Sequence, residues 1–227
     1  MRKLLFVLIF LFSQLVLQAQ IDTSADDGEF SIIATDEGLR FIYNCDDTNF
    51  MFDLICDEFK PIEAENMLFM ADDMLLQITP VPLRAIFGKM VHSLSDSLAL
   101  IYHFAYEARE IRNTLSGHYQ MKPEFIVSES GRLIYFWSFK MPGADGKDTD
   151  SLTHKIVIQM YATTRVGNRI LMLSSALISK TEPGKVKEMF IGLLNSISTS
   201  KKRINPEKVR KELIERAKTK ESENEEE

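Results

Sequence analysis

Residues 133–139 read Leu-Ile-Tyr-Phe-Trp-Ser-Phe, and they indicate how the sheet of this protein is covered. Its aromatic and β-branched residues favour a strand, in which alternate side chains point to opposite faces of a sheet. Both alternating sets are apolar, with Ser138 as the exception. A sheet with one solvated face alternates apolar with polar residues, so this stretch predicts a sheet that is covered on both faces.

The stretch belongs to a predicted run of four antiparallel strands at 125–128, 133–141, 154–164 and 169–179. Gly131 and Gly167 mark the two hairpin turns within this run. The strand at 169–179 contains Ile-Leu-Met-Leu at 170–173, which is again apolar on both faces. We therefore expect helices or other cover on each side of this sheet.

Helical periodicity predicts one covering element from about Ser93, a capping residue, to Gly117. The predicted buried stripe consists of Leu94, Leu98, Ile101, Ala105 and Ala108, widened by Phe104, Ile111 and Leu115. On this assignment His103, Glu107 and Glu110 lie on the solvent side. A second helix begins at Pro183, and its apolar stripe is Val186, Met189, Phe190, Leu193, Leu194 and Ile197.

The N-terminal half of the chain reads as short strands at 30–34, 39–44, 50–55, 67–70 and 74–79. Thr79-Pro80-Val81-Pro82 should end this run, because proline cannot donate to a strand ladder. The fold class that follows is α+β: an antiparallel sheet covered on both faces, as an α/β/α sandwich, plus a charged C-terminal helix.

The order of these elements resembles the PsbP-like family. Residues 52–59, Phe-Asp-Leu-Ile-Cys-Asp-Glu-Phe, look like the early strand and loop of that family, and residues 190–197 resemble its closing helix. The similarity would cover roughly residues 30–198. The resemblance implies an α/β/α sandwich with an accessory or binding role, and it carries over no site residues.

Charge is unevenly distributed in a chain with 27 basic and 33 acidic residues. Residues 21–58 hold eleven acids and one base, whereas residues 201–220 hold nine bases and three acids. The body therefore lacks a basic nucleic-acid footprint. Asn205-Pro206 predicts the start of a basic last helix, which we expect to run to about Lys220 and to be followed by a disordered acidic tail.

The first residues read as a secretory signal peptide. Arg2 and Lys3 precede an apolar run at 4–12, and Ala19 offers a cleavage site. The predicted organisation is a signal peptide at 1–19, a flexible acidic leader at 20–29, a sandwich domain at 30–200, and a charged helix with its tail at 201–227. This organisation predicts export to the periplasm or the medium.

The two cysteines, Cys45 and Cys56, leave two alternatives open. An exported chain could bridge them by a disulfide. If residues 46–49 form a tight hairpin turn, however, Cys56 lies roughly 20 Å along the partner strand, at about 3.3 Å per residue. The second alternative is a pair of half-buried thiols.

The remaining candidate sites are few. Tyr135, Trp137 and Phe139 could line a ligand cavity or fill the core. His103 and Glu107 are spaced i,i+4, but two ligands do not make a metal site, and the acidic loops at 46–49 and 145–150 lack the spacing of a calcium loop. A weak contact with an anionic surface or an acidic partner could use the C-terminal bases, which are Lys201, Lys202, Arg203, Lys208, Arg210 and Lys211.

No catalytic residue, cofactor site or metal site is predicted from these patterns. We expect a non-enzymatic binding or accessory protein of the bacterial envelope whose partner the sequence does not name. The alternative is a hydrolase or transferase whose polar residues converge only in three dimensions.

Overall fold

The computed structural model describes residues 28–63, 67–72, 74–88, 94–115, 119–141, 156–178 and 181–224. Within these residues the fold is mixed α+β, with two antiparallel sheets and four helices. The smaller sheet consists, in spatial order, of β1 (Glu29–Thr35), β2 (Gly38–Asn44), β3 (Asn49–Ile55) and β11 (Ser198–Ser200). The larger sheet consists, in spatial order, of β4 (Phe59–Glu63), β5 (Leu68–Ala71), β6 (Met74–Pro82), β10 (Arg169–Ile178), β9 (Ile156–Val166), β8 (Leu133–Lys140) and β7 (Lys122–Val127).

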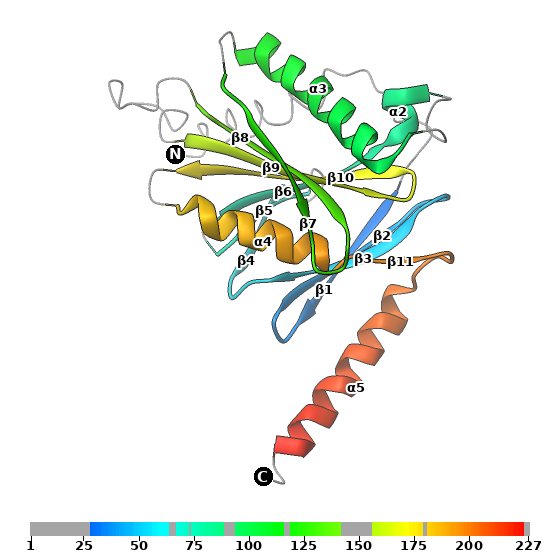
Figure 1. Cartoon of the computed structure of the whole chain (residues 1–227). Helices are drawn as coiled ribbons and strands as arrows, with labels where there is room; N and C mark the ends of the chain where they lie inside the picture. The colour runs from blue at the N-terminus through cyan, green and yellow to red at the C-terminus, as the bar shows by residue number, and fades with distance from the viewer. Residues whose placement is uncertain are drawn as a thin grey trace.

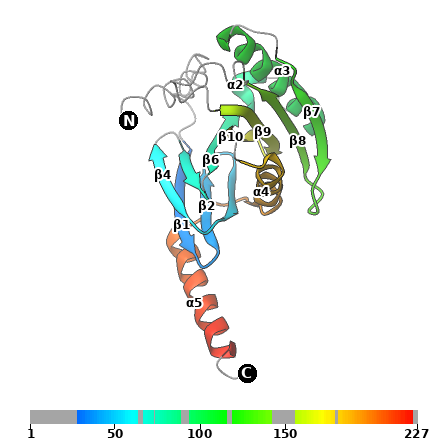
Figure 2. The same cartoon turned by 90° about the vertical axis from the view of Figure 1, so that its left-hand side faces the viewer.

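The central strands of the larger sheet are buried on both faces, whereas its edge strand β7 is mostly exposed; Figures 1 and 2 show the elements that cover the two faces. Helices α2 (Leu83–Phe87) and α3 (Asp96–Leu115) cover one face, where Trp137 is fully buried. Helix α4 (Pro183–Asn195) and the smaller sheet together cover the other face. The structure thus has two sheets where the sequence predicts one, and the second sheet supplies part of the cover.

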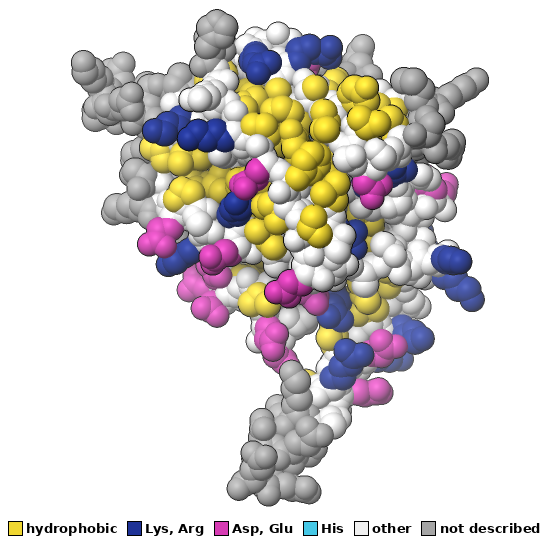
Figure 3. Space-filling model, in the orientation of Figure 1, with side chains coloured by type: hydrophobic (Ala, Val, Ile, Leu, Met, Phe, Trp, Pro, Cys, Tyr) yellow, Lys and Arg dark blue, Asp and Glu magenta, His cyan; other side chains and the backbone are white. Residues whose placement is uncertain are grey.

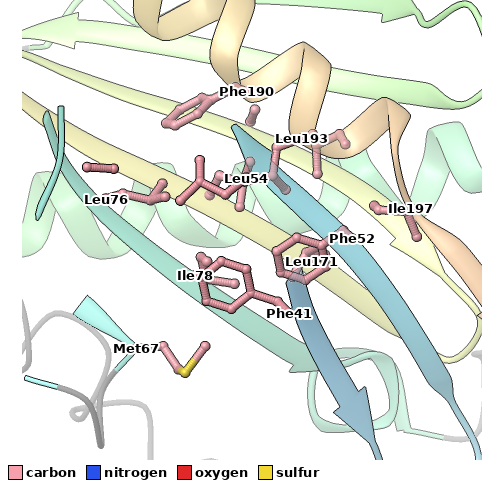
Figure 4. Close-up of a cluster of buried hydrophobic side chains, with 14 of the residues drawn as sticks. Phe41, Phe52, Leu54, Met67, Leu76, Ile78, Leu171, Phe190, Leu193 and Ile197 are labelled. Atoms are coloured by element: carbon pink, nitrogen blue, oxygen red, sulfur yellow. The ribbon is translucent and has the colours of Figure 1, made fainter. Parts of the chain in front are cut away.

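The main hydrophobic core lies between the two sheets and α4 (Figure 4). Phe41 and Phe52 of the smaller sheet stack with ring centroids 5.0 Å apart, and Phe41 meets Phe69 of the larger sheet edge-on at 5.6 Å. Phe190 and Leu193 of α4 are buried against the same cluster. These aromatic contacts hold the two sheets face to face.

The chain changes sheets between β3 and β4, and a carboxylate stabilises this passage. Asp72 accepts hydrogen bonds through Oδ1 from the backbone N–H groups of Asp57 and Glu58, at 2.9 and 2.8 Å. Strands β4 and β5 start the larger sheet directly after this point. Strand β4 was not predicted from the sequence; it is an edge strand, where its Pro61 is tolerated.

The prediction that prolines end the strand at Thr79 is wrong, because β6 continues to Pro82 and pairs with β10 throughout. The N–H of Ile78 donates to the carbonyl of Met67, on the β5 side of β6. Pro80 and Pro82 follow Ile78 at alternate positions, so their backbone nitrogens also point to the β5 side. Both lie beyond Gln77, the last residue of β6 that pairs with β5. No ladder bond to β10 is lost, so both prolines are tolerated.

The predicted buried face of α3 is correct for Ala108 and Ile111 but wrong for Leu98 and Ile101. The residues that the helix buries are Ala99, Leu100, His103, Ala108 and Ile111. Leu98, Ile101 and Tyr102 are instead 44%, 38% and 51% exposed. Ala99, Leu100 and Ile111 lie in one buried cluster with Trp137 and Tyr161, and the small Ala99 permits close approach of the helix to these aromatic rings.

Two hairpin turns from different sheets interlock. The N–H of Asn168, in the β9–β10 turn, donates to Oγ1 of Thr48, in the β2–β3 turn, at 3.2 Å. The Asn168 side-chain amide also donates to Asp47 at 3.2 Å. Gly167 has φ +59°, and a Cβ at this position would lie 2.9 Å from Thr48 Oγ1. The close approach and the positive φ both require glycine here.

Helix α5 (Pro206–Asn224) leaves the body after β11 and points away from it (Figure 2). Asn205 caps it, since its Oδ1 accepts from the N–H groups of Glu207 and Lys208. Val209 packs on Ile33 and Ile42 of the smaller sheet. The first turns of α5 therefore cover the outer face of that sheet, and the helix extends four residues past Lys220.

Several expectations fall outside the described residues: the signal peptide at 1–19, the acidic leader up to residue 27, the capping role of Ser93 and the acidic loop at 145–150. Among the helices of the described residues, none has the length and apolar character needed to cross a membrane.

Candidate functional site

A groove of about 750 Å³ lies where the smaller sheet, α4 and α5 meet. The β1–β2 turn and the end of β3 form one side, the C-terminal half of α4 forms the second, and the middle of α5 forms the third. Figure 3 shows a gap between the body and α5 in this region, with acidic side chains on the body side. The groove brings together segments from both ends of the described chain.

An ion pair between neighbouring strands lies on the wall of the groove. Arg40 of β2 donates from Nε and Nη2 to the two carboxylate oxygens of Asp53 on β3, at 2.7 and 2.8 Å. These hydrogen bonds raise the pKa of the Arg40 guanidinium above its ordinary value. The bidentate geometry fixes both side chains and neutralises the charge of Arg40.

The rest of the groove is more acidic than basic. Its lining holds four acidic and two basic side chains, a formal balance of −2. Asp36, Glu37 and Glu188 are exposed and make no ion pair within the described parts of the chain. After the Arg40–Asp53 pair is set aside, Arg216 is the one basic side chain of the described lining.

The groove also exposes apolar surface. Leu54 and Leu193 are 1% and 2% exposed and form its floor. Ile55 on β3 and Ile214 on α5 line its walls and are 72% and 49% exposed. Large apolar side chains that remain this exposed beside a cavity are typical of binding surfaces.

One edge of β3 ends in the groove. β11 pairs with β3 no further than Met51, and the N–H of Asp53 then donates to the Ser196 hydroxyl at 2.8 Å. Ile55 lies two residues beyond Asp53, so its backbone groups point in the same direction, away from β2. The described residues supply no further strand at this edge.

A second polar site is buried under α3. His103 is fully buried, and neither ring nitrogen has a hydrogen-bond partner among the described residues. Its Nε2 lies 3.7 Å from Oε1 of Glu107, whose side chain is 20% exposed. The prediction that His103 faces solvent is therefore wrong, and Glu107 beside it is only partly exposed.

Burial perturbs both groups in this pair. It lowers the pKa of His103 to about 4. It also raises the pKa of Glu107 to about 7, with a further contribution from the charge of Glu110. Desolvation penalises the charged form in each case, so near neutral pH the site holds a neutral imidazole and a carboxyl group close to its midpoint.

The predicted aromatic candidates lie in this second region, away from the groove. Trp137 stacks on Tyr161 with ring centroids 3.8 Å apart, while Tyr135 and Phe139 are 7% and 3% exposed. Phe104 of α3 packs edge-on against Tyr135 and Trp137. Their arrangement matches the core-packing alternative, and none of the three lines the groove.

Cys45 and Cys56 are both free thiols. Cys45 lies in the β2–β3 turn, where its thiol donates to the carbonyl of Thr48 at 3.0 Å and Arg169 Nε donates to its Sγ at 3.2 Å. Cys56 follows the far end of β3. The hairpin alternative thus describes this segment, and the length of the strand separates the two sulfurs.

The six predicted basic residues cluster at the foot of α5. Arg203 pairs with Glu29, Lys208 lies 3.8 Å from Glu212, and Arg210 lies 3.4 Å from Glu207. Lys201, Lys202 and Lys211 are exposed and make no ion pair with the described residues. Metal-ligating side chains do not gather in groups of three or more in the described part of the chain.

Sequence reasoning did not identify the groove. Its walls come from β1, β3, α4 and α5, and no local motif marks such a junction. The signal that could have suggested it is an isoleucine beside charged residues on two of the walls, Ile55 on β3 and Ile214 on α5, both of which are exposed. The buried His103 could have been found from the alternative helical stripe 99, 103, 107 and 111.

Comparison with protein-family models, with curated protein sequences and with solved structures found no match for this chain. The comparisons therefore lend no site residues to the groove or to the His103 region.

Proposed function

We propose that this protein is an exported accessory module of the bacterial envelope, which binds a partner in the groove between β3, α4 and α5 without catalysing a reaction. The observation that carries the proposal is the groove itself, about 750 Å³ in volume, with exposed isoleucines on its walls. The apolar run at residues 4–12 supports export. From the order of its elements along the chain, we also propose that its fold is a PsbP-like α/β/α sandwich.

The polar groups of the groove favour binding over covalent chemistry. Ser196 donates its hydroxyl to the carbonyl of Leu193 at 2.8 Å and accepts from the N–H of Asp53. The hydrogen bonds of Ser196 within the described residues all join it to backbone groups, so none of them links its hydroxyl to a basic side chain. A hydrolase or transferase, the competing proposal, needs a base within hydrogen-bond reach of its nucleophile.

The basic residues just before α5 offer a second contact with a partner. Lys201 and Lys202 are exposed beside the groove-lining helix and make no ion pair with the described residues. They stay candidates for weak attachment to an anionic surface while the groove holds its partner.

Blocking the groove from α4 tests the proposal. Gly192 lines the groove, and a Cβ added to it meets no atom within 4 Å, so the side chain of Gly192→Trp starts in open space at the groove and should obstruct it. Gly184→Trp is the matched control, since Gly184 lies on the same helix in equally open space but outside the groove lining. We expect envelope components captured by the wild-type protein to be lost with Gly192→Trp and kept with Gly184→Trp. Identical capture by all three proteins would contradict the assignment of the groove.

A further inference from the structure

We infer that the groove takes a peptide segment in which lysine or arginine alternates with apolar side chains. This inference rests on the proposed function and adds the chemical class of the occupant. Three features of the groove carry it: its charge, the position of its exposed apolar side chains, and the open edge of β3.

The charge of the groove selects a cationic occupant. Asp36 and Glu37 in the β1–β2 turn and Glu188 on α4 are exposed, and within the described residues none of them forms an ion pair. Arg40 is neutralised by its bidentate bonds to Asp53 at 2.7 and 2.8 Å. Arg216 is the one other base of the described lining, against these three carboxylates. An anionic lipid or a nucleic acid would therefore meet a net negative rim, whereas a basic side chain would meet carboxylates in excess.

The apolar side chains select an amphipathic occupant. Ile55 and Ile214 face the same cavity from two different elements, above the buried Leu54 and Leu193. An occupant that covers both isoleucines removes apolar surface from water, while its basic groups reach the carboxylates at the rim. A purely polar cation would leave this apolar surface exposed.

The open edge of β3 favours a peptide over a cationic amphiphile. β11 ends its pairing at Met51, and the Ser196 hydroxyl takes the next position at Asp53. The backbone groups of Ile55 point the same way into the groove, where an extended peptide can pair with them as an added strand. Alternating side chains of such a strand face the isoleucines and the carboxylates in turn.

Fluorescence anisotropy with two labelled peptides tests the inference on the purified protein. One probe is a short peptide of alternating lysine and leucine, and the other is the same peptide with glutamate in place of lysine. We expect the lysine peptide to bind, with an affinity that falls as salt rises, and the glutamate peptide not to bind. Gly192→Trp should abolish binding of the lysine peptide, and Gly184→Trp should not.

Charge variants locate the contact. Glu37→Gln combined with Glu188→Gln should weaken binding of the lysine peptide by roughly threefold to tenfold, because two exposed carboxylates are lost. Glu182→Gln is the control, since Glu182 is an exposed carboxylate at the start of α4, outside the groove lining. Thermal unfolding of each variant verifies that it is folded.

The outcomes distinguish a failure of the cationic-peptide assignment from a failure of the groove function. Equal binding of both peptides, or binding unchanged by the Glu37→Gln/Glu188→Gln variant, would overturn the cationic-peptide assignment. If the lysine peptide fails to bind while partner capture still depends on an open groove, the occupant class is wrong and the groove function stands. If Gly192→Trp leaves partner capture unchanged, the groove function is wrong as well.

Discussion

His103 and Glu107 face each other one turn apart on α3, with Nε2 and Oε1 separated by 3.7 Å, and burial shifts their pKa values in opposite directions. Burial raises the pKa of Tyr161 of the larger sheet, and the charge of Glu107 raises it further. Each group of the pair makes the free energy of unfolding depend on pH, with opposite signs.

Replacing His103 should remove the loss of stability that the wild-type protein suffers as the pH falls. The folded pKa is about 4 against 6.5 for the free side chain, so the unfolded chain binds a proton first and stability falls as pH drops from 6.5 to 4. The full loss is about 3 kcal/mol for a shift of this size. Urea unfolding of His103→Leu should therefore show a gain over wild type that grows through this window. A constant difference at all pH values would contradict the assignment.

Replacing Glu107 should act in the opposite direction. Its folded pKa is about 7 against 4.5, so the folded protein retains a proton that the unfolded chain has lost, and stability falls as pH rises between these values. Because the side chain is partly exposed, we expect Glu107→Gln to gain about 2 kcal/mol over wild type above pH 7 and little below pH 4.5. The same urea titration measures it, and a gain confined to low pH would refute it.

Gly167 and Gly131 form a matched pair for the interlocked turns. Both have positive φ, at 59° and 77°, but a Cβ meets Thr48 at 2.9 Å in the first case and nothing within 4 Å in the second. Gly131→Ala should cost about 1 kcal/mol from backbone strain, and Gly167→Ala about 2 kcal/mol or more. Chemical denaturation gives both values. Equal losses would show that the turn moves away from Thr48 at no cost.

Val209 tests whether α5 stabilises the smaller sheet. It is 8% exposed against Ile33 and Ile42, whereas Ile214 on the same helix is 49% exposed. Val209→Ala should lower the free energy of unfolding by about 1–2 kcal/mol, and Ile214→Ala by less than about 0.5 kcal/mol. Thermal melting of the two variants provides the comparison. No difference between them would mean that α5 is held by its polar contacts alone.

The sequence supported the strand pattern better than the arrangement of the sheets. Residues 133–139 are apolar on both faces, and this pattern predicted burial on both sides of the larger sheet because strand alternation is local. The second sheet was not predicted. Its strand β11 pairs with β3, which lies far away in the sequence, and the three residues of β11, Ser198–Ser200, show no apolar pattern that would predict a strand.

The face of α3 was misassigned for a different reason. A helix with apolar residues on two sides offers two stripes, and the choice between them depends on the shape of the sheet beneath. Ala99, Leu100 and Ile111 pack in one cluster with the stacked Trp137 and Tyr161, and His103 of the same helix is buried as well. The groove was missed because its exposed isoleucines come from β3 and α5, which only the folded chain brings together.

The pairing of β11 with β3 sets an order of events during synthesis. Strands β1, β2 and β3 leave the ribosome early, but the strand that covers the first half of the outer edge of β3 is among the last segments to be made. Until then that edge lacks its partner strand, although Phe41 can already meet Phe69 of β5. An unpaired strand edge invites association with other chains, so the N-terminal hairpins are most exposed to such pairing before α4 and β11 have been made.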